Sequence, residues 1–129
     1  NEGAVTLANG SVKWYSTYVD YAKAHSIIAG DYADYNARID RLEFVNVFYN
    51  ALPASEYAPK NTVADNAIPD MPLSAPNAAK VYAFYRAGVL TGNDAAGSFN
   101  PSSHIKRSEV AAILTRMFDA AARKSITLD

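Results

Sequence analysis

The 129-residue chain contains no cysteine. This absence excludes a disulfide framework, thiol catalysis and cysteine-based metal sites. It leaves the compartment open, because cytoplasmic proteins and the exported proteins of bacteria that do not rely on disulfides share this feature. The sequence also has no apolar run near the roughly 18 residues that a membrane-spanning helix needs. We therefore expect no membrane insertion.

An excess of charge of either sign is also lacking. The chain has 12 Lys and Arg against 13 Asp and Glu, for a net charge of -1. No strong electrostatic field exists to attract nucleic acid or an anionic membrane, so a few placed residues must perform any anion recognition. The sequence starts at Asn1 without an initiating Met or a visible signal peptide, and we expect a mature or excised fragment.

The signatures of catalysis and of metal or phosphate binding are missing as well. The two histidines, His25 and His104, are not in an H-E-x-x-H motif, and no G-x-S-x-G occurs. The segment GNDAAG offers one carboxylate, Asp94, and lacks the Gly-Lys-Ser/Thr of a P-loop. Asp31 and Asp34 lie in a loop without the signature of an apolar pocket, which is weak support for a glycosidase. We expect no enzyme, no cofactor and no metal.

The chain does contain helical periodicity. Half of its residues are apolar, enough for the core of one domain. Apolar residues recur three or four positions apart in four stretches. The first expected helix has Ser11 as its N-cap, passes through Trp14 and Tyr18, and stops at Gly30.

The second expected helix starts near Asp40, where Asp40 and Glu43 form a capping box, and Pro53 ends it. The third begins with Pro76 in its first turn and is interrupted near its end by Gly88.

The fourth expected helix runs from about Lys106 to Arg123, and a short strand is expected at the C-terminal end. Phe99 lies in the loop before this helix, where we expect it to plug a packing gap. Trp14 is expected to be in the core rather than on the surface. Helical spacing also places four phenylalanines in the expected core: Phe44, Phe48, Phe84 and Phe118.

The four helices form an internal repeat, helix-loop-helix twice over. The loops align at an offset of 62 and the second helices at an offset of 66, because the second loop is four residues longer. The equivalent residues are Gly30 and Gly92, Arg41 and Arg107, and Glu43 and Glu109. One helix pair of this size cannot bury its apolar face alone, so the copies must pack on each other or on something further.

The order of these motifs resembles the S-layer homology module of bacterial surface proteins. The second copy carries IPDM at 68–71, AGVLTG at 87–92, GSFNP at 97–101 and IKRSEV at 105–110. The first copy carries Trp14, SIIAG at 26–30 and IDRLEF at 39–44. The first copy lacks the F-x-D-V start and the G-x-F-x-P loop of that family.

The resemblance implies an all-α fold of helix-loop-helix units packed as a small bundle, with a pseudo-threefold arrangement if a third repeat is supplied. The expected division is an N-terminal extension at 1–11, a first repeat at 12–53, a proline-rich connection at 54–67, a second repeat at 68–120 and a tail at 121–129.

The resemblance also implies a non-catalytic anchor, extracellular in the cell wall or S-layer of a Gram-positive bacterium. Such modules bind secondary cell-wall polysaccharide, often through a sugar that bears a pyruvate ketal. The Arg of the family's R-A-E motif lines the ligand groove, which here means Arg41 and Arg107. The chemistry agrees, because Arg meets a carboxylate with two parallel hydrogen bonds and a helix start favours an anion. Gly30 and Gly92 let the backbone approach a ligand closely.

Further candidates for glycan contact are Lys106 and Arg38, which flank the two arginines, and Trp14. Three residues are expected to fix helix starts instead: Asp40, Glu43 and Glu109. The rival interpretation is a protein–protein or self-assembly module, in which another chain or another repeat covers an unfinished apolar surface.

Overall fold

The computed structural model describes residues 6–10 and 13–129. Its elements in chain order are the helices α1 (Ser16–Ala24) and α2 (Arg41–Tyr49), the 3-10 helix η1 (Ala54–Tyr57), the strand β1 (Thr62–Val63), the helices α3 (Ala78–Ala87) and α4 (Arg107–Phe118), the 3-10 helix η2 (Ala120–Ala122) and the strand β2 (Thr127–Leu128). The predicted all-α class is confirmed, with one small parallel sheet added. Among the described residues no helix is long and apolar enough to cross a membrane.

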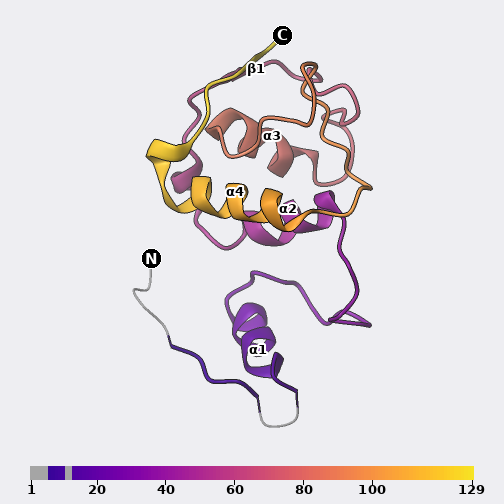
Figure 1. Ribbon diagram of the computed structural model, residues 1–129, viewed down its shortest axis with the longest axis vertical. Coiled ribbons are helices and arrows are strands. Elements are labelled where there is room, and N and C mark those ends of the chain that lie inside the picture. The colour runs from indigo at the N-terminus through magenta and orange to yellow at the C-terminus, as the bar shows by residue number, and fades with distance from the viewer. Residues whose placement is uncertain (1–5, 11–12) are drawn as a thin grey trace.

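Helix α3 is the centre of the core. Val81, Phe84 and Tyr85 of its predicted stripe are fully buried, and the helix packs against α2. Figure 1 shows α2, α3 and α4 gathered in one body, with α1 apart from them. The helix begins two residues later than expected from Pro76. It ends at Gly88, whose φ of +81° is left-handed and beside which the tail passes closely.

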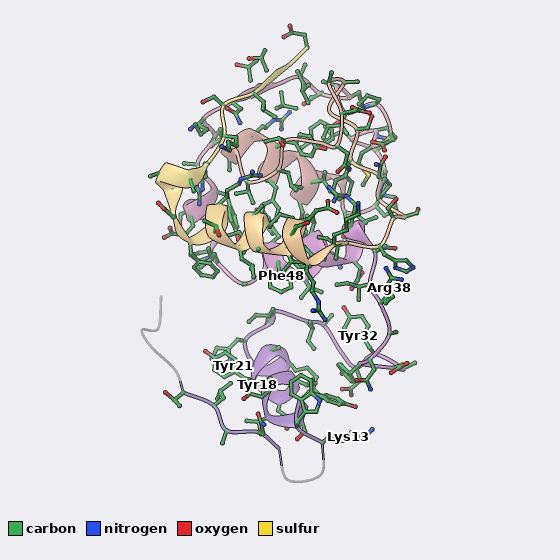
Figure 2. All side chains as sticks on the ribbon, viewed as in Figure 1. Lys13, Tyr18, Tyr21, Tyr32, Arg38 and Phe48 are labelled. Carbon is green, nitrogen blue, oxygen red and sulfur yellow. The ribbon has the colours of Figure 1, made fainter. Side chains whose placement is uncertain are left out.

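Helix α2 begins where its capping pattern predicts. Asp40 is the N-cap residue, and its carboxylate accepts the Glu43 backbone N–H at 2.8 Å. Phe44 is buried, while Phe48 is only partly covered. Figure 2 shows Phe48 on the edge of the body that faces α1. The apolar face of α2 therefore packs on α3 at one side and is incompletely covered at the other.

Helix α4 ends at Phe118, five residues before the expected end at Arg123. The Arg123 guanidinium folds back instead, and its Nε and Nη2 donate to the carbonyls of Arg116 (2.8 Å) and Met117 (3.1 Å). These bonds satisfy carbonyls that the helix end leaves without partners. The expected core position of Phe118 is wrong, since its side chain is 68% exposed and Met117 takes the inward place.

The first repeat is less closely packed than predicted. Helix α1 starts at Ser16, and the proposed N-cap, Ser11, lies outside the described residues. None of the α1 residues is buried. The expected core position of Trp14 is also wrong: its side chain is 64% exposed, and its ring contacts are the neighbouring Tyr15 and Tyr18. No large apolar surface of the body comes to cover it.

Gly30 does not end the first helix. Helix α1 stops at Ala24, and Ser26 takes the left-handed conformation (φ 58°) that the prediction assigned to a glycine. Gly30 has no such conformation, and a Cβ at this position would meet nothing within 4 Å. The predicted need for glycine here is therefore not supported.

The repeat extends beyond the two helices. Each second helix is followed by a short 3-10 helix and then by a strand. The two strands pair in parallel, with Thr62 opposite Thr127 and Val63 opposite Leu128. The predicted C-terminal strand is confirmed, and the proline-rich connection has structure of its own, with Tyr57 and Val63 buried.

Candidate functional site

The IPDM segment anchors the loop that precedes α4. The two carboxylate oxygens of Asp70 accept the backbone N–H groups of Phe99 (2.8 Å) and Asn100 (2.7 Å). The Phe99 ring is fully buried, as the predicted packing plug. The Tyr85 hydroxyl donates to the Gly97 carbonyl at 2.9 Å. The IPDM and GSFNP segments therefore contact each other and fix the shape of this loop.

Gly92 is required by a close approach of backbone to backbone. Its φ is +87°, and a Cβ here would lie 2.5 Å from the Gly97 Cα. The Asn93 N–H donates to the Ser98 carbonyl (2.8 Å), and the Asp94 carboxylate accepts the Ser98 N–H (3.0 Å). This last bond lowers the pKa of Asp94. The one carboxylate of the glycine loop thus serves the loop itself.

Arg41 joins the two repeats. The residue is only 4% exposed, although α2 belongs to the first repeat and its partners to the second. Its Nε donates to the Phe99 carbonyl at 2.6 Å, and the guanidinium carbon lies 5.2 Å from the centre of the Phe99 ring. The guanidinium also forms an ion pair with Glu109 of α4. The Arg of the first R-x-E motif therefore binds the Glu of the second.

Backbone groups strengthen this contact. The Arg41 N–H donates to the Ser103 carbonyl (2.9 Å), and the Leu42 N–H donates to the Pro101 carbonyl (3.1 Å). Asp40 and His104 form an isolated antiparallel bridge. The first N–H groups of a helix have no partner inside the helix, and here the loop of the next repeat supplies their acceptors.

The contact of Arg41 with a glycan stays a prediction, and the structure adds that this side chain is buried and paired with Glu109. Burial lowers the pKa of the Arg41 guanidinium, and the nearby Tyr85 and Asp70 act in the opposite direction. Arginine remains charged in proteins, so the charge is present but is paired with Glu109. Arg41 lies at the repeat interface rather than on an open surface.

Glu109 has a second contact at the start of α4. Its Oε1 accepts the Lys106 backbone N–H at 3.3 Å, which is one half of a capping box. The other half is impossible, because an ammonium group accepts no hydrogen bond. Glu109 thus fixes the helix start and the repeat interface together.

A polar hollow of about 230 Å³ lies next to this contact. Loop residues 90–93 form one side, and one face of α4 forms the other, with Arg41 also in the lining. The α4 residues in the lining are Ser108, Glu109, Ala112, Ile113 and Arg116. Arg116 is half-buried, and its Nη1 donates to the Val89 carbonyl at 3.3 Å. It forms no ion pair within the described part of the chain, so the hollow keeps one net positive charge.

The sequence signal that would have indicated Arg116 as a lining residue of the hollow is its spacing from the R-x-E motif. The helix turns by about 100° per residue, so Arg116 lies two turns beyond Glu109 on the same face. By the same geometry Arg107 lies on the opposite side of α4 from the hollow. The structure therefore does not bring Arg107 together with Arg41.

The other predicted cations are surface charges. Arg107, Lys106 and Arg38 are all exposed, and none of their side chains forms an ion pair with a residue that the structure describes. Figure 2 shows Arg38 on the segment that leads from Tyr32 into α2. Their contact with a ligand remains a prediction.

The first repeat has an equivalent hollow of about 330 Å³. Loop residues 27–32 line it together with one face of α2, and Lys80 of α3 completes it. The two hollows match at the offsets found in the sequence: Gly30 with Gly92, Glu43 with Glu109, Val47 with Ile113, and Asn50 with Arg116. The Lys80 ammonium donates to Asn46 Oδ1 at 2.6 Å. Each repeat therefore forms a polar hollow between its loop and its second helix, with a cation in each lining. The hollow of the first repeat also contains the carboxylates of Asp31 and Glu43, so it lacks the net positive charge of the second.

An apolar hollow of about 320 Å³ lies on the other side of the first loop. Trp14 and Tyr18 line it with Tyr32 and Tyr35 of the loop. The Tyr32 hydroxyl donates to the Glu43 carboxylate. Burial, and after it in importance this hydrogen bond, raises the pKa of Tyr32 to about 12. Glu43 is thus tied to the loop of its own repeat, in contrast to Glu109.

Comparison with known proteins supports the resemblance found in the second repeat. Residues 67–111 match the model of the S-layer homology domain, a span that contains IPDM, GSFNP and the R-x-E start of α4. No curated protein and no solved structure matches the chain. S-layer homology domains are generally non-catalytic modules that anchor proteins to cell walls by binding cell-wall glycans. This chain therefore carries an S-layer homology domain at residues 67–111, the kind of module associated with the bacterial cell surface.

Proposed function

We propose that the chain anchors a larger surface protein to an acidic glycan of a Gram-positive cell wall and performs no catalysis. The observation that carries this proposal is the hollow beside α4. It combines the Arg116 guanidinium, which has no acidic partner among the described residues, with polar groups of the loop at residues 90–93.

The chemistry of the hollow suits an acidic sugar. A pyruvate ketal carries a carboxylate, which a guanidinium binds through two parallel N–H groups. Thr91, Asn93 and Ser108 provide polar groups for sugar hydroxyls. A free Glu109 would repel such a ligand, but Arg41 already neutralises it. One charge-assisted bond contributes about 1.5–3 kcal/mol, and several neutral bonds beside it bring the expected affinity into the micromolar range.

The roles of the predicted residues shift accordingly. Arg41 supports the hollow from the repeat interface, and Arg116 takes the part that the motif assigned to Arg41 and Arg107. Gly30 and Lys80 line the equivalent hollow of the first repeat, but the carboxylates of Asp31 and Glu43 lie there too, so we assign the acidic ligand to the hollow beside α4.

The test is a pelleting assay with purified Gram-positive cell walls, either intact or stripped of secondary polymer by acid. We expect binding to intact walls only. Arg116→Ala should weaken it about 10- to 100-fold, the equivalent of the charge-assisted bond. Arg116→Lys should recover part of the loss, because lysine keeps the charge but not the planar fork. Lys124→Ala, which removes an exposed cation that is not part of the lining, is the matched control.

Two outcomes contradict the proposal. Equal binding to stripped walls would exclude the secondary polymer as the ligand. Loss of binding in Arg107→Ala but not in Arg116→Ala would place the anion site on the side of α4 that faces away from the hollow. Thermal unfolding of each variant separates a lost contact from a lost fold.

A second candidate function is assembly with another protein. The observation in its favour is the exposed aromatic surface of the first repeat, where Trp14 and Tyr18 border the apolar hollow. A mass that rises with concentration in sedimentation equilibrium, and that returns to the monomer value in Trp14→Ala, would support it.

A further inference from the structure

The apolar hollow of the first repeat has a wall of aromatic rings. Five rings line it, and they come from α1, from the residues just before α1 and from the loop that follows. In order of contact they are Tyr18, Trp14, Tyr15, Tyr35 and Tyr32. The centre of each ring lies 5.1–6.3 Å from the centre of the next. Figure 2 shows Tyr18 on α1 and Tyr32 on the segment between α1 and α2. The rings therefore form one connected surface.

The lining of this hollow carries negative charge alone. Asp34 and the half-buried Glu43 contribute two carboxylates, and no Lys or Arg of the described chain lines it. Glu43 accepts the Tyr32 hydroxyl, and Asp34 Oδ1 accepts the Asn36 backbone N–H at 2.9 Å. Each carboxylate keeps one oxygen without a hydrogen-bond partner, and neither forms an ion pair, within the residues that the structure describes. The charge is thus opposite to that of the hollow beside α4.

The chain itself places a cation against this aromatic surface. The Lys13 ammonium lies 5.8 Å from the centre of the Tyr15 ring, which is the distance of a cation–π contact. Lys13 is not among the residues that line the apolar hollow. The aromatic surface therefore attracts a cation from the chain, and the hollow between the rings and the two carboxylates has space for another.

We infer that the hollow binds an alkylated ammonium group, of the kind that a trimethylammonium headgroup presents. The negative faces of the rings attract the positive charge, and the two carboxylates compensate it. The alkyl groups suit the apolar lining, whereas a primary ammonium is strongly hydrated and loses more on entering it. A neutral sugar would stack on the rings but gain nothing from the carboxylates. This inference is independent of the anion site at Arg116.

The test uses the only tryptophan of the chain, Trp14, whose fluorescence reports occupancy because its ring lines the hollow. The full chain is titrated with choline and with 3,3-dimethyl-1-butanol, the neutral isostere in which carbon replaces nitrogen. Sodium chloride keeps the ionic strength constant, and calorimetry measures both dissociation constants. We expect choline to bind at least about tenfold more tightly than the isostere, as a cation–π contact in a partly desolvated site provides.

Trp14→Leu separates the aromatic face from apolar contact, because leucine keeps an apolar side chain without a ring. It should weaken choline binding about 5- to 30-fold by calorimetry and leave binding of the isostere nearly unchanged. The Trp14 side chain is 64% exposed, so the fold should be retained, which thermal unfolding checks. Arg116→Ala should leave choline binding unchanged, which separates this site from the proposed glycan site.

Two substitutions test the carboxylates. Glu43→Gln and Asp34→Asn remove a charge and keep an acceptor for the hydrogen bond that each carboxylate receives. Each should weaken choline binding about threefold, as is typical of a solvent-accessible charge pair. Asp20→Asn is the matched control, since Asp20 is an exposed carboxylate of α1 outside the lining.

Four outcomes would overturn the inference. Equal binding of choline and its isostere would reduce the hollow to an apolar site, and no binding of choline would exclude the cation altogether. An equal effect of Asp20→Asn and Glu43→Gln would assign the charge effect to the surface at large. Loss of the choline signal as the protein concentration rises, together with a rising mass in sedimentation equilibrium, would assign the hollow to a second copy of the chain.

Discussion

The contact of Arg41 with the second repeat predicts a large loss of stability for Arg41→Ala. The side chain is 4% exposed and contacts Phe99 through one hydrogen bond and the aromatic face, while its ion pair joins Glu109. All of these contacts cross from the first repeat to the second. The substitution therefore removes the side-chain contacts of Arg41 with the second repeat and leaves Glu109 without its cation.

The magnitude depends on the burial of the two partners. Removing one member of a buried ion pair costs about 3–5 kcal/mol, because the other charge is left unpaired. The Glu109 side chain keeps 26% exposure and can be partly rehydrated. We therefore expect the lower end of the range, about 3 kcal/mol. For a chain of this length that loss lowers Tm by about 10 °C.

The assay is urea unfolding at neutral pH followed by circular dichroism, with calorimetry for Tm. Arg107→Ala is the control, since it makes the same chemical change at the equivalent but exposed position, and it should stay within about 0.5 kcal/mol of the parent. A second arm replaces the pair together as Arg41→Met with Glu109→Leu, which should recover much of the loss because neither charge is then buried alone. A cost of Arg41→Ala no greater than that of Arg107→Ala would refute the reasoning.

Three further predictions concern the loop and the core. Gly92→Ala should cost about 2 kcal/mol or more, because its φ is left-handed and the new Cβ would meet backbone at 2.5 Å, while Gly30→Ala should be nearly neutral; the two are compared by urea unfolding. Asp70→Asn should cost about 1–2 kcal/mol, since one carbonyl oxygen replaces two acceptors of backbone N–H groups; unfolding and amide exchange in the 97–101 loop report the loss. Burial raises the pKa of Tyr57 to about 12, so as the pH rises the unfolded chain loses this proton before the folded chain does. The free energy of unfolding should therefore fall between about pH 10 and pH 12, which ultraviolet titration of the tyrosines with parallel unfolding measurements tests.

The helices that periodicity and capping define could be predicted from the sequence. Asp40 starts α2, and Gly88 ends α3, because both signals act within a few residues of the backbone they serve. Phe99 could be assigned to packing because the motif around it is specific. In each case the local sequence contains the cause.

The failures have a common physical origin. Apolar spacing indicates which face of a helix seeks cover, but it does not show whether another element provides it. Trp14 has the right spacing and remains exposed, because no large apolar surface of the body lies against α1. Phe118 falls one residue beyond the last inward position, where the chain turns and Arg123 satisfies the helix end. Both errors depend on contacts distant in sequence.

The arginines of the two R-x-E motifs show why a motif position does not by itself define a role. Arg41 and Arg107 occupy equivalent places on equivalent helices, yet one is buried in an ion pair and the other is exposed. The difference lies in the neighbouring repeat, because the second repeat brings to Arg41 a loop and a glutamate that receive it. The hollow with the family's glycine then takes its uncompensated cation from Arg116, two turns further along α4. In a repeat protein the function of a motif residue thus depends on the neighbour that its repeat meets, and two copies of one motif with different neighbours are expected to respond to the same substitution in different ways.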